Sequence, residues 1–182
     1  MSKLKDELSA FEFTHISSKT HILGNIKSLL DDAGYTIVEI NDTKPWGAYA
    51  RLANSDASKF IEEFFPGLSL EDAQLGLAGA ELSPKILIVS PSQRLSWQYH
   101  DRRAERWTFL TTGAYNKSIN DEPGELEIAQ PDDIVQFACG ERHRLVGVED
   151  KYTVVAEIWQ HTDVGRPSDE DDIVRLIDDY QR

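Results

Sequence analysis

Residues 85–111 read KILIVSPSQRLSWQYHDRRAERWTFLT, and this stretch decides the fold class of the chain. It holds three short runs rich in β-branched and aromatic residues, KILIV, SWQYH and WTFLT, with the turn-forming residues Pro91 and Gly113 beside them. Two more runs of this kind follow, DIVQF at 133–137 and YTVVAEIW at 152–159. Many short strands separated by turn signals predict an antiparallel β-sandwich or barrel. Because no helices alternate with these runs, we exclude a parallel sheet.

Helical patterns occur only outside this β-rich part. Apolar residues at helical spacing predict a helix over 20–34, after which residues 35–40 (YTIVEI) form a strand. A second, shorter helix is expected over 57–65. A third is predicted over 168–180, because a serine suited to N-capping is followed by acidic residues that favour the first turn of a helix.

The composition is that of a globular chain, since 40% of its 182 residues are hydrophobic and 28% are charged. This length suits one domain. The net charge of −13 argues against nucleic acid as a partner, because phosphate backbones are bound by an excess of lysine and arginine. The single cysteine, Cys139, permits no disulfide within the chain, which fits a reducing compartment. The N-terminus is charged and no apolar run is long enough to span a bilayer, so we expect a cytoplasmic protein without a membrane partner.

Arginines gather in two places in this acidic chain. Four lie between positions 94 and 106, and two flank His143. A local basic group of this kind is suited to bind a small anion. The alternative is a lattice of surface salt bridges, which are common and contribute little to stability. The residues alone leave both interpretations open.

Four residues suggest a metal site: Gln98, His100, Glu105 and His143. Gln98 and His100 are two apart in a β-rich run, so their side chains point to the same face. Glu105 follows a short turn-like stretch, and His143 follows a turn at Gly140. Two imidazoles, a carboxylate and an amide oxygen that converge inside a barrel would bind a divalent ion such as zinc, manganese, iron, cobalt or nickel. The alternative is a surface histidine and a glutamate at the barrel rim.

The spacing of these residues resembles the two sequence motifs of the cupin superfamily. Seven residues separate Glu105 from Gly113 and four separate it from His100, and Gly-x-x-His follows at 140–143. Glutamine in place of the first histidine is typical of phosphomannose isomerases. Further segments are similar to the type II branch of that family: KPWGAY at 44–49, LSWQYH at 95–100, RAERW at 103–107, EDDIVR at 170–175 and DYQR at 179–182.

The resemblance implies an antiparallel cupin jelly-roll β-barrel from about Lys44 to Gln160, with N-terminal and inserted helices and a C-terminal helix outside it. Residues 1–43 would form a helix and strand extension that packs on the barrel. Residues 44–182 would form the cupin domain, with a helical insertion at about 55–82. The pattern departs from the family at several positions that would line the pocket, so specificity for mannose 6-phosphate does not carry over. These positions are Asp101, Arg102, Arg106, Ala138 and Gln181.

The implied activity is that of a metal-dependent aldose–ketose isomerase acting on a sugar phosphate, with zinc as the expected metal. The resemblance places Lys85 and Arg175 in the barrel mouth as catalytic residues. Lys85 also has the same parity in its strand as Leu87 and Val89, which predicts an inward side chain. The alternatives are that Lys85 is the protective charge of an edge strand and that Arg175 is an exposed helix cation paired with a nearby aspartate.

Three residues are expected to bind or position the substrate: Arg103, Ser96 and Arg94. Asp172 is expected to be catalytic as a proton-transfer base. A metal-bound water and Glu157 are open alternatives for that role, which the sequence does not decide.

Two other functions compete with the isomerase. One is a cupin that binds a sugar phosphate without turnover, because the pocket walls differ from the family pattern. The other is a metal cupin dioxygenase, which normally uses a triad of ligands with open positions on iron; Gln98 argues against it. The expected partner is a phosphorylated sugar, and a homodimer is the oligomer that we allow for.

Overall fold

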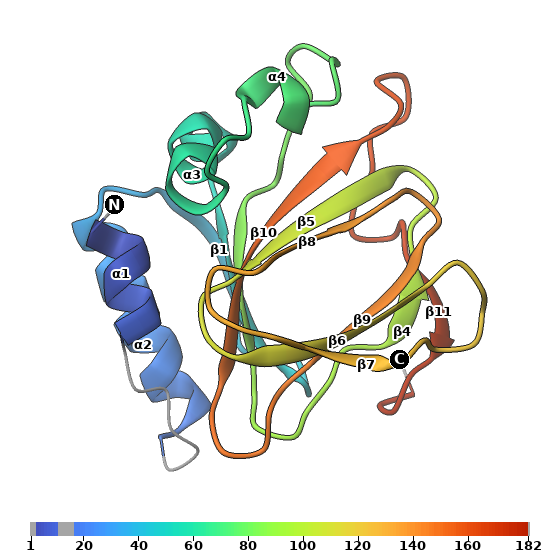
Figure 1. Cartoon of the computed structure of the whole chain (residues 1–182). Coiled ribbons are helices and arrows are strands. Elements are labelled where there is room, and N and C mark those ends of the chain that lie inside the picture. Colours follow the sequence, from blue (N-terminus) through green and yellow to red (C-terminus); the bar gives the residue numbers. More distant parts are fainter. Residues whose placement is uncertain (1–2, 11–16, 182) are drawn as a thin grey trace.

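The computed structural model describes residues 3–10 and 17–181. Its strands form two antiparallel sheets that face each other as a barrel (Figure 1). The six-stranded sheet has the order β1-β2-β3-β10-β5-β8, and the five-stranded sheet has the order β11-β4-β9-β6-β7. Neighbours that are distant in the chain, such as β3 and β10, are typical of a jelly roll. The expected antiparallel jelly-roll barrel is therefore confirmed.

The strands of the six-stranded sheet are β1 (Ile37–Asn41), β2 (Gly47–Leu52), β3 (Lys85–Val89), β10 (Thr153–His161), β5 (Arg103–Phe109) and β8 (Ile134–Phe137). Those of the five-stranded sheet are β11 (Val174–Ile177), β4 (Trp97–Tyr99), β9 (Arg142–Val146), β6 (Gly113–Ser118) and β7 (Leu126–Ala129). The helices are α1 (Lys3–Ala10), α2 (Lys19–Asp32), the 3₁₀ turn η1 (Asn54–Asp56), α3 (Ala57–Phe64) and α4 (Leu70–Ala73).

The helices α1, α2 and α3 lie together outside the barrel, on the side of the six-stranded sheet (Figure 1). At the start of α2, the Ser18 hydroxyl accepts a hydrogen bond from a backbone N–H of the first turn. Apolar residues of the helices, such as Ile26 and Phe60, pack in one cluster with Ile88 and Ala156 of the sheet. We call this cluster the outer core. Its members are aliphatic and aromatic residues, so burial of apolar area helps to hold the helices on the barrel.

The barrel interior is layered, because the register of its strands places like residues side by side. Leu87 pairs with Val155, which in turn pairs with Phe109, and these three belong to an apolar inner cluster. One inward position further along, Lys85 pairs with Glu157. Polar and charged side chains therefore occupy one end of the interior, while apolar side chains fill the other.

The predicted C-terminal helix over 168–180 is wrong. This segment forms a turn and then β11, which pairs with β4 at the edge of the five-stranded sheet. The acidic residues make the turn, because the N–H groups of Asp171 and Asp172 both donate to the side chain of Asp169 at 3.1 Å. The unpaired edge of β4 offers this segment a ladder of hydrogen bonds, and the alternating burial of β11 suits a strand.

Helix α1 was not predicted, whereas the predicted N-terminal helix and strand are present with shifted ends. α2 ends at Asp32, and Gly34 follows with a φ of +74°, a conformation that glycine adopts without strain. The strand predicted from residue 35 begins at Ile37.

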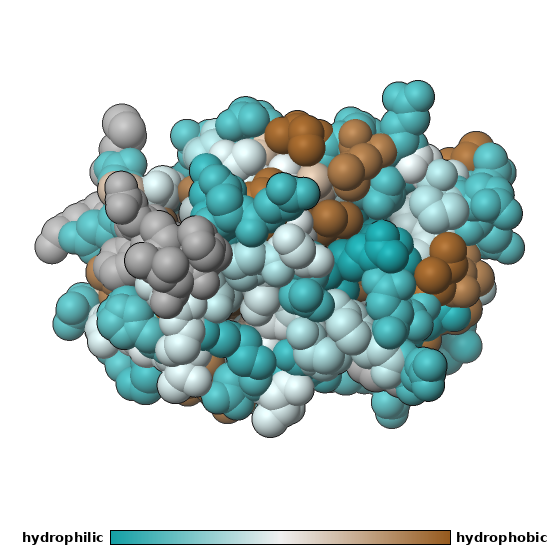
Figure 2. All heavy atoms as spheres, turned by 90° about the horizontal axis from the view of Figure 1, so that it is seen from below, coloured by the Kyte–Doolittle hydropathy of each residue, from teal (hydrophilic) through white to brown (hydrophobic). Residues whose placement is uncertain are grey.

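Hydrophilic residues prevail on the face drawn in Figure 2, where hydrophobic side chains gather in small separate groups. The exposed apolar side chains of the described residues include Ile119 and Ile128. Within residues 3–10 and 17–181, no helix has the length and apolar character that a membrane span requires.

Candidate metal centre

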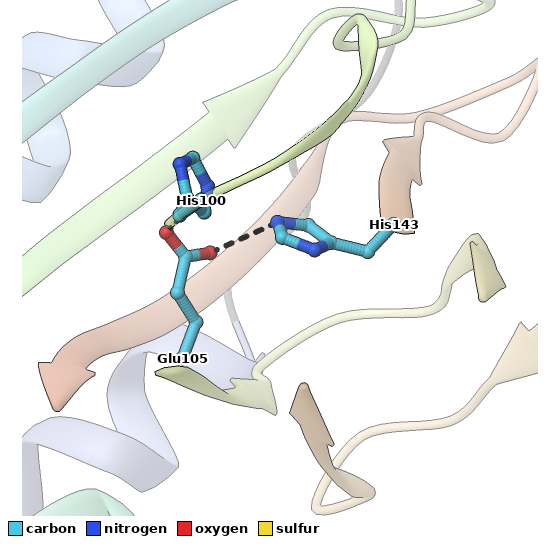
Figure 3. Close-up of side chains that lie close together, drawn as sticks. All are labelled: His100, Glu105 and His143. Carbon is cyan, nitrogen blue, oxygen red and sulfur yellow. Dashed lines mark ion pairs between the residues drawn. The ribbon is translucent and has the colours of Figure 1, made fainter. Parts of the chain in front are cut away.

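Three polar side chains converge inside the barrel: His100 at the end of β4, Glu105 on β5 and His143 on β9. All three are buried, and their ligand atoms lie within 4.8 Å of one another. Figure 3 shows the carboxylate of Glu105 between the two imidazoles. One carboxylate oxygen is 3.1 Å from Nε2 of His100, and the other is 3.3 Å from Nε2 of His143. The strands thus bring together two nitrogen ligands and a carboxylate that are up to 43 positions apart in the chain.

Backbone carbonyls orient both imidazoles. Nδ1 of His100 donates to the carbonyl of Asp172, and Nδ1 of His143 donates to the carbonyl of Glu141 at 3.0 Å. A neutral imidazole with its proton on Nδ1 presents a lone pair on Nε2, which is the arrangement of a metal-binding histidine. Nε2 of His143 is buried and has no hydrogen-bond partner, although it lies 3.3 Å from Glu105. A bound cation would satisfy this nitrogen, so the residues fit a metal ion.

The protonation states of the group also suit a cation. Burial lowers the pKa of His100, which favours the neutral imidazole. Burial alone would raise the pKa of Glu105, but the neighbouring His100 and Arg103 hold that pKa well below its usual range. Metal binding requires neutral imidazoles and ionised carboxylates. This buried group of His100, Glu105 and His143 could therefore bind a metal, and we call it the metal group.

Gln98 lies beside the group. It is paired with His143 across β4 and β9 and lines the adjoining pocket. Its carbonyl oxygen accepts a hydrogen bond of 2.6 Å from the hydroxyl of Ser96, which also lines the pocket. The hydrogen bond fixes the orientation of the Gln98 amide and leaves a second lone pair on the oxygen.

Arg103 is packed against the same group and is almost fully buried. Its Nε donates to Glu105 at 2.8 Å, and its Nη1 donates to the hydroxyl of Ser168 at 2.7 Å. The guanidinium stacks on Trp159, with 3.7 Å between its carbon and the ring centroid. Nη2 lies 3.3 Å from Nε2 of His100. Arg103 therefore holds Glu105 in place and brings a fixed positive charge to the edge of the site.

An open pocket of about 560 Å³, including its solvent-filled mouth, adjoins the metal group. Its wall contains four cations, three carboxylates, several aromatic and aliphatic residues, and the polar pair of Ser96 and Gln98. The cations are Lys44, Lys85, Arg103 and Arg175, and the carboxylates are Glu105, Glu157 and Glu170. Such a wall matches a polar ligand.

Lys85 is buried in this wall with 4% of its side chain exposed. Its ammonium group lies 3.5 Å from the centroid of Trp159 and donates to Glu170 at 2.8 Å. The interpretation of Lys85 as an edge-strand charge is wrong, because β3 lies between β2 and β10. Its inward direction, expected from parity with Leu87 and Val89, is confirmed.

Arg175 lies on β11, where it pairs with Gln98, and its exposed side chain lines the pocket. The interpretation of Arg175 as a helix cation is wrong, because the segment is a strand. Within the described part of the chain, no carboxylate lies within ion-pair distance of Arg175. Its guanidinium is therefore available to an anion in the pocket.

Asp172 and Arg94 lie outside the pocket wall. The carboxylate of Asp172 accepts hydrogen bonds from the backbone of Asp101 and Arg102 and from the hydroxyl of Ser168. These donors lower its pKa, although burial acts in the opposite direction. Asp172 therefore shapes the turn after β4, and its carbonyl orients His100.

The arginines of the two arginine-rich stretches differ in their surroundings. Arg94, Arg102 and Arg142 form surface ion pairs with aspartates, as the salt-bridge interpretation expects. Arg103 instead points inward to the pocket. The candidate anion site therefore includes fewer arginines than the sequence suggested. Only the tertiary structure distinguishes these arginines from those in surface ion pairs.

Sequence reasoning did not single out Lys44, Trp159 or Glu170 as pocket residues. Lys44 and Glu170 open the KPWGAY and EDDIVR segments, so the motifs were a usable signal. The ring of Trp159 stacks between Lys85 and Arg103 at the pocket wall.

Comparison with known proteins gives a relationship in fold. No protein-family model matches the chain, and no curated protein sequence matches it. Among solved structures, the capsular polysaccharide assembling protein CapF from Staphylococcus aureus is similar with a TM-score of 0.53 and 13% identity, over 87% of this chain and 38% of CapF. Another CapF crystal form gives a TM-score of 0.51 and 13% identity, over 77% of this chain and 34% of CapF. A Cupin 2 conserved barrel domain protein from Salinispora arenicola CNS-205 gives a TM-score of 0.45 and 15% identity, over 68% of this chain and 82% of the other.

These similarities concern the fold alone. The chain spans little more than a third of the length of the CapF chains that it matches. At 13% identity the match to CapF shows a common fold, and the activity of this chain has to be argued from its own pocket.

Proposed function

We propose that this protein is a metal-dependent aldose–ketose isomerase that acts on a sugar phosphate. The observation that supports the proposal is that two features lie side by side in one cavity. The buried His100–Glu105–His143 group lies beside a pocket whose wall holds Lys85 and Arg175. The first feature suits a cation, and the second suits the phosphate of a substrate.

In this proposal Gln98 completes the ligand set of His100, Glu105 and His143. Two imidazoles with oxygen ligands suit zinc, with manganese, cobalt, nickel or iron as alternatives. When bound, such a metal supplies Lewis-acid polarisation of the sugar carbonyl.

Arg175 and Lys85 have the positions to act on the substrate directly. The free guanidinium of Arg175 at the pocket mouth would grip the phosphate or stabilise the negative charge that develops on the sugar oxygens. Lys85 lies deeper and would contact the reacting end. Ser96 would hold the metal ligand Gln98 in place, and Arg103 would hold the metal ligand Glu105. Both residues would also help to position the substrate. We assign Asp172 a positioning role through His100. Arg94, which is paired with Asp179 outside the pocket, is left without a role at the substrate.

The fold neighbour adds a second line of support. CapF is described as a capsular polysaccharide assembling protein, which associates this barrel with carbohydrate. A cupin that binds a sugar phosphate without turnover is the alternative that shares the same pocket. A dioxygenase would use the same three ligands on iron, but the charged wall suits an anionic substrate better than an apolar one.

The test is a turnover screen of aldose and ketose phosphates with zinc, manganese, cobalt and nickel added to metal-free protein. We expect interconversion of at least one aldose–ketose pair that requires metal and is lost in His100→Ala. Binding of a sugar phosphate without turnover would support the binding module. Oxygen consumption with iron, in the absence of isomerisation, would support the dioxygenase. Either result would overturn the isomerase.

A further inference from the structure

The geometry points to Glu157 as the residue that moves the substrate proton in this pocket. The inference rests on the proposed isomerase function and adds to it the base that the sequence leaves open. Glu157 lies on β10, the strand at the centre of the six-stranded sheet. It pairs with Lys85 on one side and with Trp107 on the other, and its carboxylate lines the pocket.

The two oxygens of Glu157 have different surroundings. Oε1 accepts a hydrogen bond of 3.0 Å from the indole N–H of Trp107. Among the described residues, no hydrogen-bond donor reaches Oε2. One oxygen is thus anchored to the barrel wall, and the other is available to a molecule in the pocket. A proton-transfer group needs this combination of fixed direction and free reach.

The other carboxylates near the pocket are committed elsewhere. Glu105 belongs to the metal group, and Glu170 is 60% exposed and ion-paired with Lys85. Asp172 has its carboxylate occupied by three donors. Of the acidic residues in the described part of the chain, Glu157 is therefore the one that is buried, faces the cavity and keeps an oxygen free.

Charged side chains on both neighbouring strands surround Glu157 in the metal-free protein. Burial and the negative charge of Glu105 raise its pKa to about 8, against the opposing effect of Lys85 and Arg103. The charged neighbours of Glu157 lie on the two adjacent strands. Strand β5 carries Glu105, Arg103 and Trp107, and strand β3 carries Lys85.

The transfer then balances within the pocket. The Glu157 carboxylate removes the proton from the carbon beside the carbonyl, and the C–H electron pair becomes the double bond of the enediol. The ammonium group of Lys85 gives a proton to the carbonyl oxygen. In the second half, the neighbouring hydroxyl returns a proton to Lys85, and Glu157 delivers its proton to the former carbonyl carbon. No oxidant or other reactant is needed.

The test compares Glu157→Gln with the parent in the zinc-loaded protein, with mannose 6-phosphate, fructose 6-phosphate and the other sugar phosphates of the screen as probes in D₂O. NMR measures both isomerisation and deuterium incorporation at the carbon beside the carbonyl. We expect the variant to fold, to keep its zinc and to bind the sugar phosphate as the parent does, while both rates fall at least ~100-fold, the low end of what a lost acid–base group costs. Glu127→Gln, on the exposed strand β7, is the matched control and should leave both rates unchanged.

Deuterium exchange at the parental rate in Glu157→Gln would overturn the inference and leave the isomerase proposal standing. A parent protein that neither isomerises nor exchanges any of the probes would overturn the isomerase proposal, and Glu157 with it. If Glu157→Gln does not fold, Glu157→Asp decides. It retains a carboxylate on a shorter stem, and we expect measurable exchange with an altered pH profile. Failure of both variants to fold would make Glu157 a structural residue and overturn its catalytic role.

Discussion

The two faces of β10 belong to regions of opposite composition, one hydrophobic and the other charged. The outward residues Val154, Ala156 and Ile158 join the helices in the outer core, which consists of aliphatic and aromatic residues. The inward residues alternate with them, and there Glu157 and Trp159 face charged neighbours on β3 and β5. All nine residues of the strand are buried, so burial alone does not distinguish the two faces.

The difference separates stability from function. Apolar burial on the outer face contributes directly to folding. Charged groups on the inner face lose their hydration and are tolerated only because they are paired or hydrogen-bonded. The proposed function assigns these charges to binding, and the two regions should therefore respond differently to substitution.

The largest effect is expected at the metal group. His100→Ala removes a ligand and should lower zinc affinity by more than the ~10–100-fold that loss of an outer hydrogen-bond partner costs. Zinc content after dialysis and titration calorimetry measure this loss. The circular dichroism spectrum should stay that of the parent, because the apolar outer core is untouched. Retention of stoichiometric zinc would mean that the group is not the metal site.

Phe60→Ala tests the opposite region. Phe60 is fully buried in the outer core, so truncation should lower the free energy of unfolding by about 3–5 kcal/mol. Urea denaturation of the metal-free protein measures it. Zinc stoichiometry at low denaturant should be unchanged, because the helices lie outside the barrel. A variant that unfolds no more easily yet loses zinc would reverse the assignment of the two regions.

Arg175→Ala separates substrate binding from metal binding. Its loss should raise the activation barrier by about 3 kcal/mol if the guanidinium stabilises developing negative charge, while zinc content stays the same. Arg94→Ala is the control, because that residue forms an exposed ion pair worth ~0.2–1 kcal/mol of stability. Steady-state kinetics on the best substrate of the screen compares them. A parental rate in Arg175→Ala would move the role to Lys85 or Arg103.

A further prediction concerns the pH dependence of stability in the metal-free protein. The pKa of Glu157 is raised from 4.5 to about 8 on folding, so between these values the folded state holds more protons than the unfolded chain. The free energy of unfolding should therefore fall as the pH rises through this window, with no further contribution from this group above it. Denaturation curves across the window measure the slope. Glu157→Gln should remove that contribution, and an unchanged slope would show that another group causes it.

The fold was predictable from sequence where local patterns and packing agree. The β-rich runs give the antiparallel class, and the spacing of Ile22, Ile26 and Leu30 gives α2. The C-terminal segment failed because Asp169 and its acidic neighbours suit both a helical first turn and a side-chain-capped turn. The free edge of β4, which the sequence does not display, selected the strand.

The candidate site was predictable in part for a similar reason. His100, Glu105 and His143 converge as the motif spacing suggested. The arginines were not separable, because Arg102 and Arg103 are adjacent in sequence yet one is ion-paired at the surface and the other points inward. Their directions follow from strand parity, which depends on where β5 begins.

By itself, the sequence determined the residue types and spacings of the barrel, the metal group and the pocket motifs, because these depend on chemistry and on the period of a strand. Only the tertiary structure decided which charges share a cavity. Lys85, Glu157 and Arg175 come from three strands in two sheets, and their proximity arises from strand order and register. Those depend on contacts between segments far apart in the chain, which no local pattern encodes.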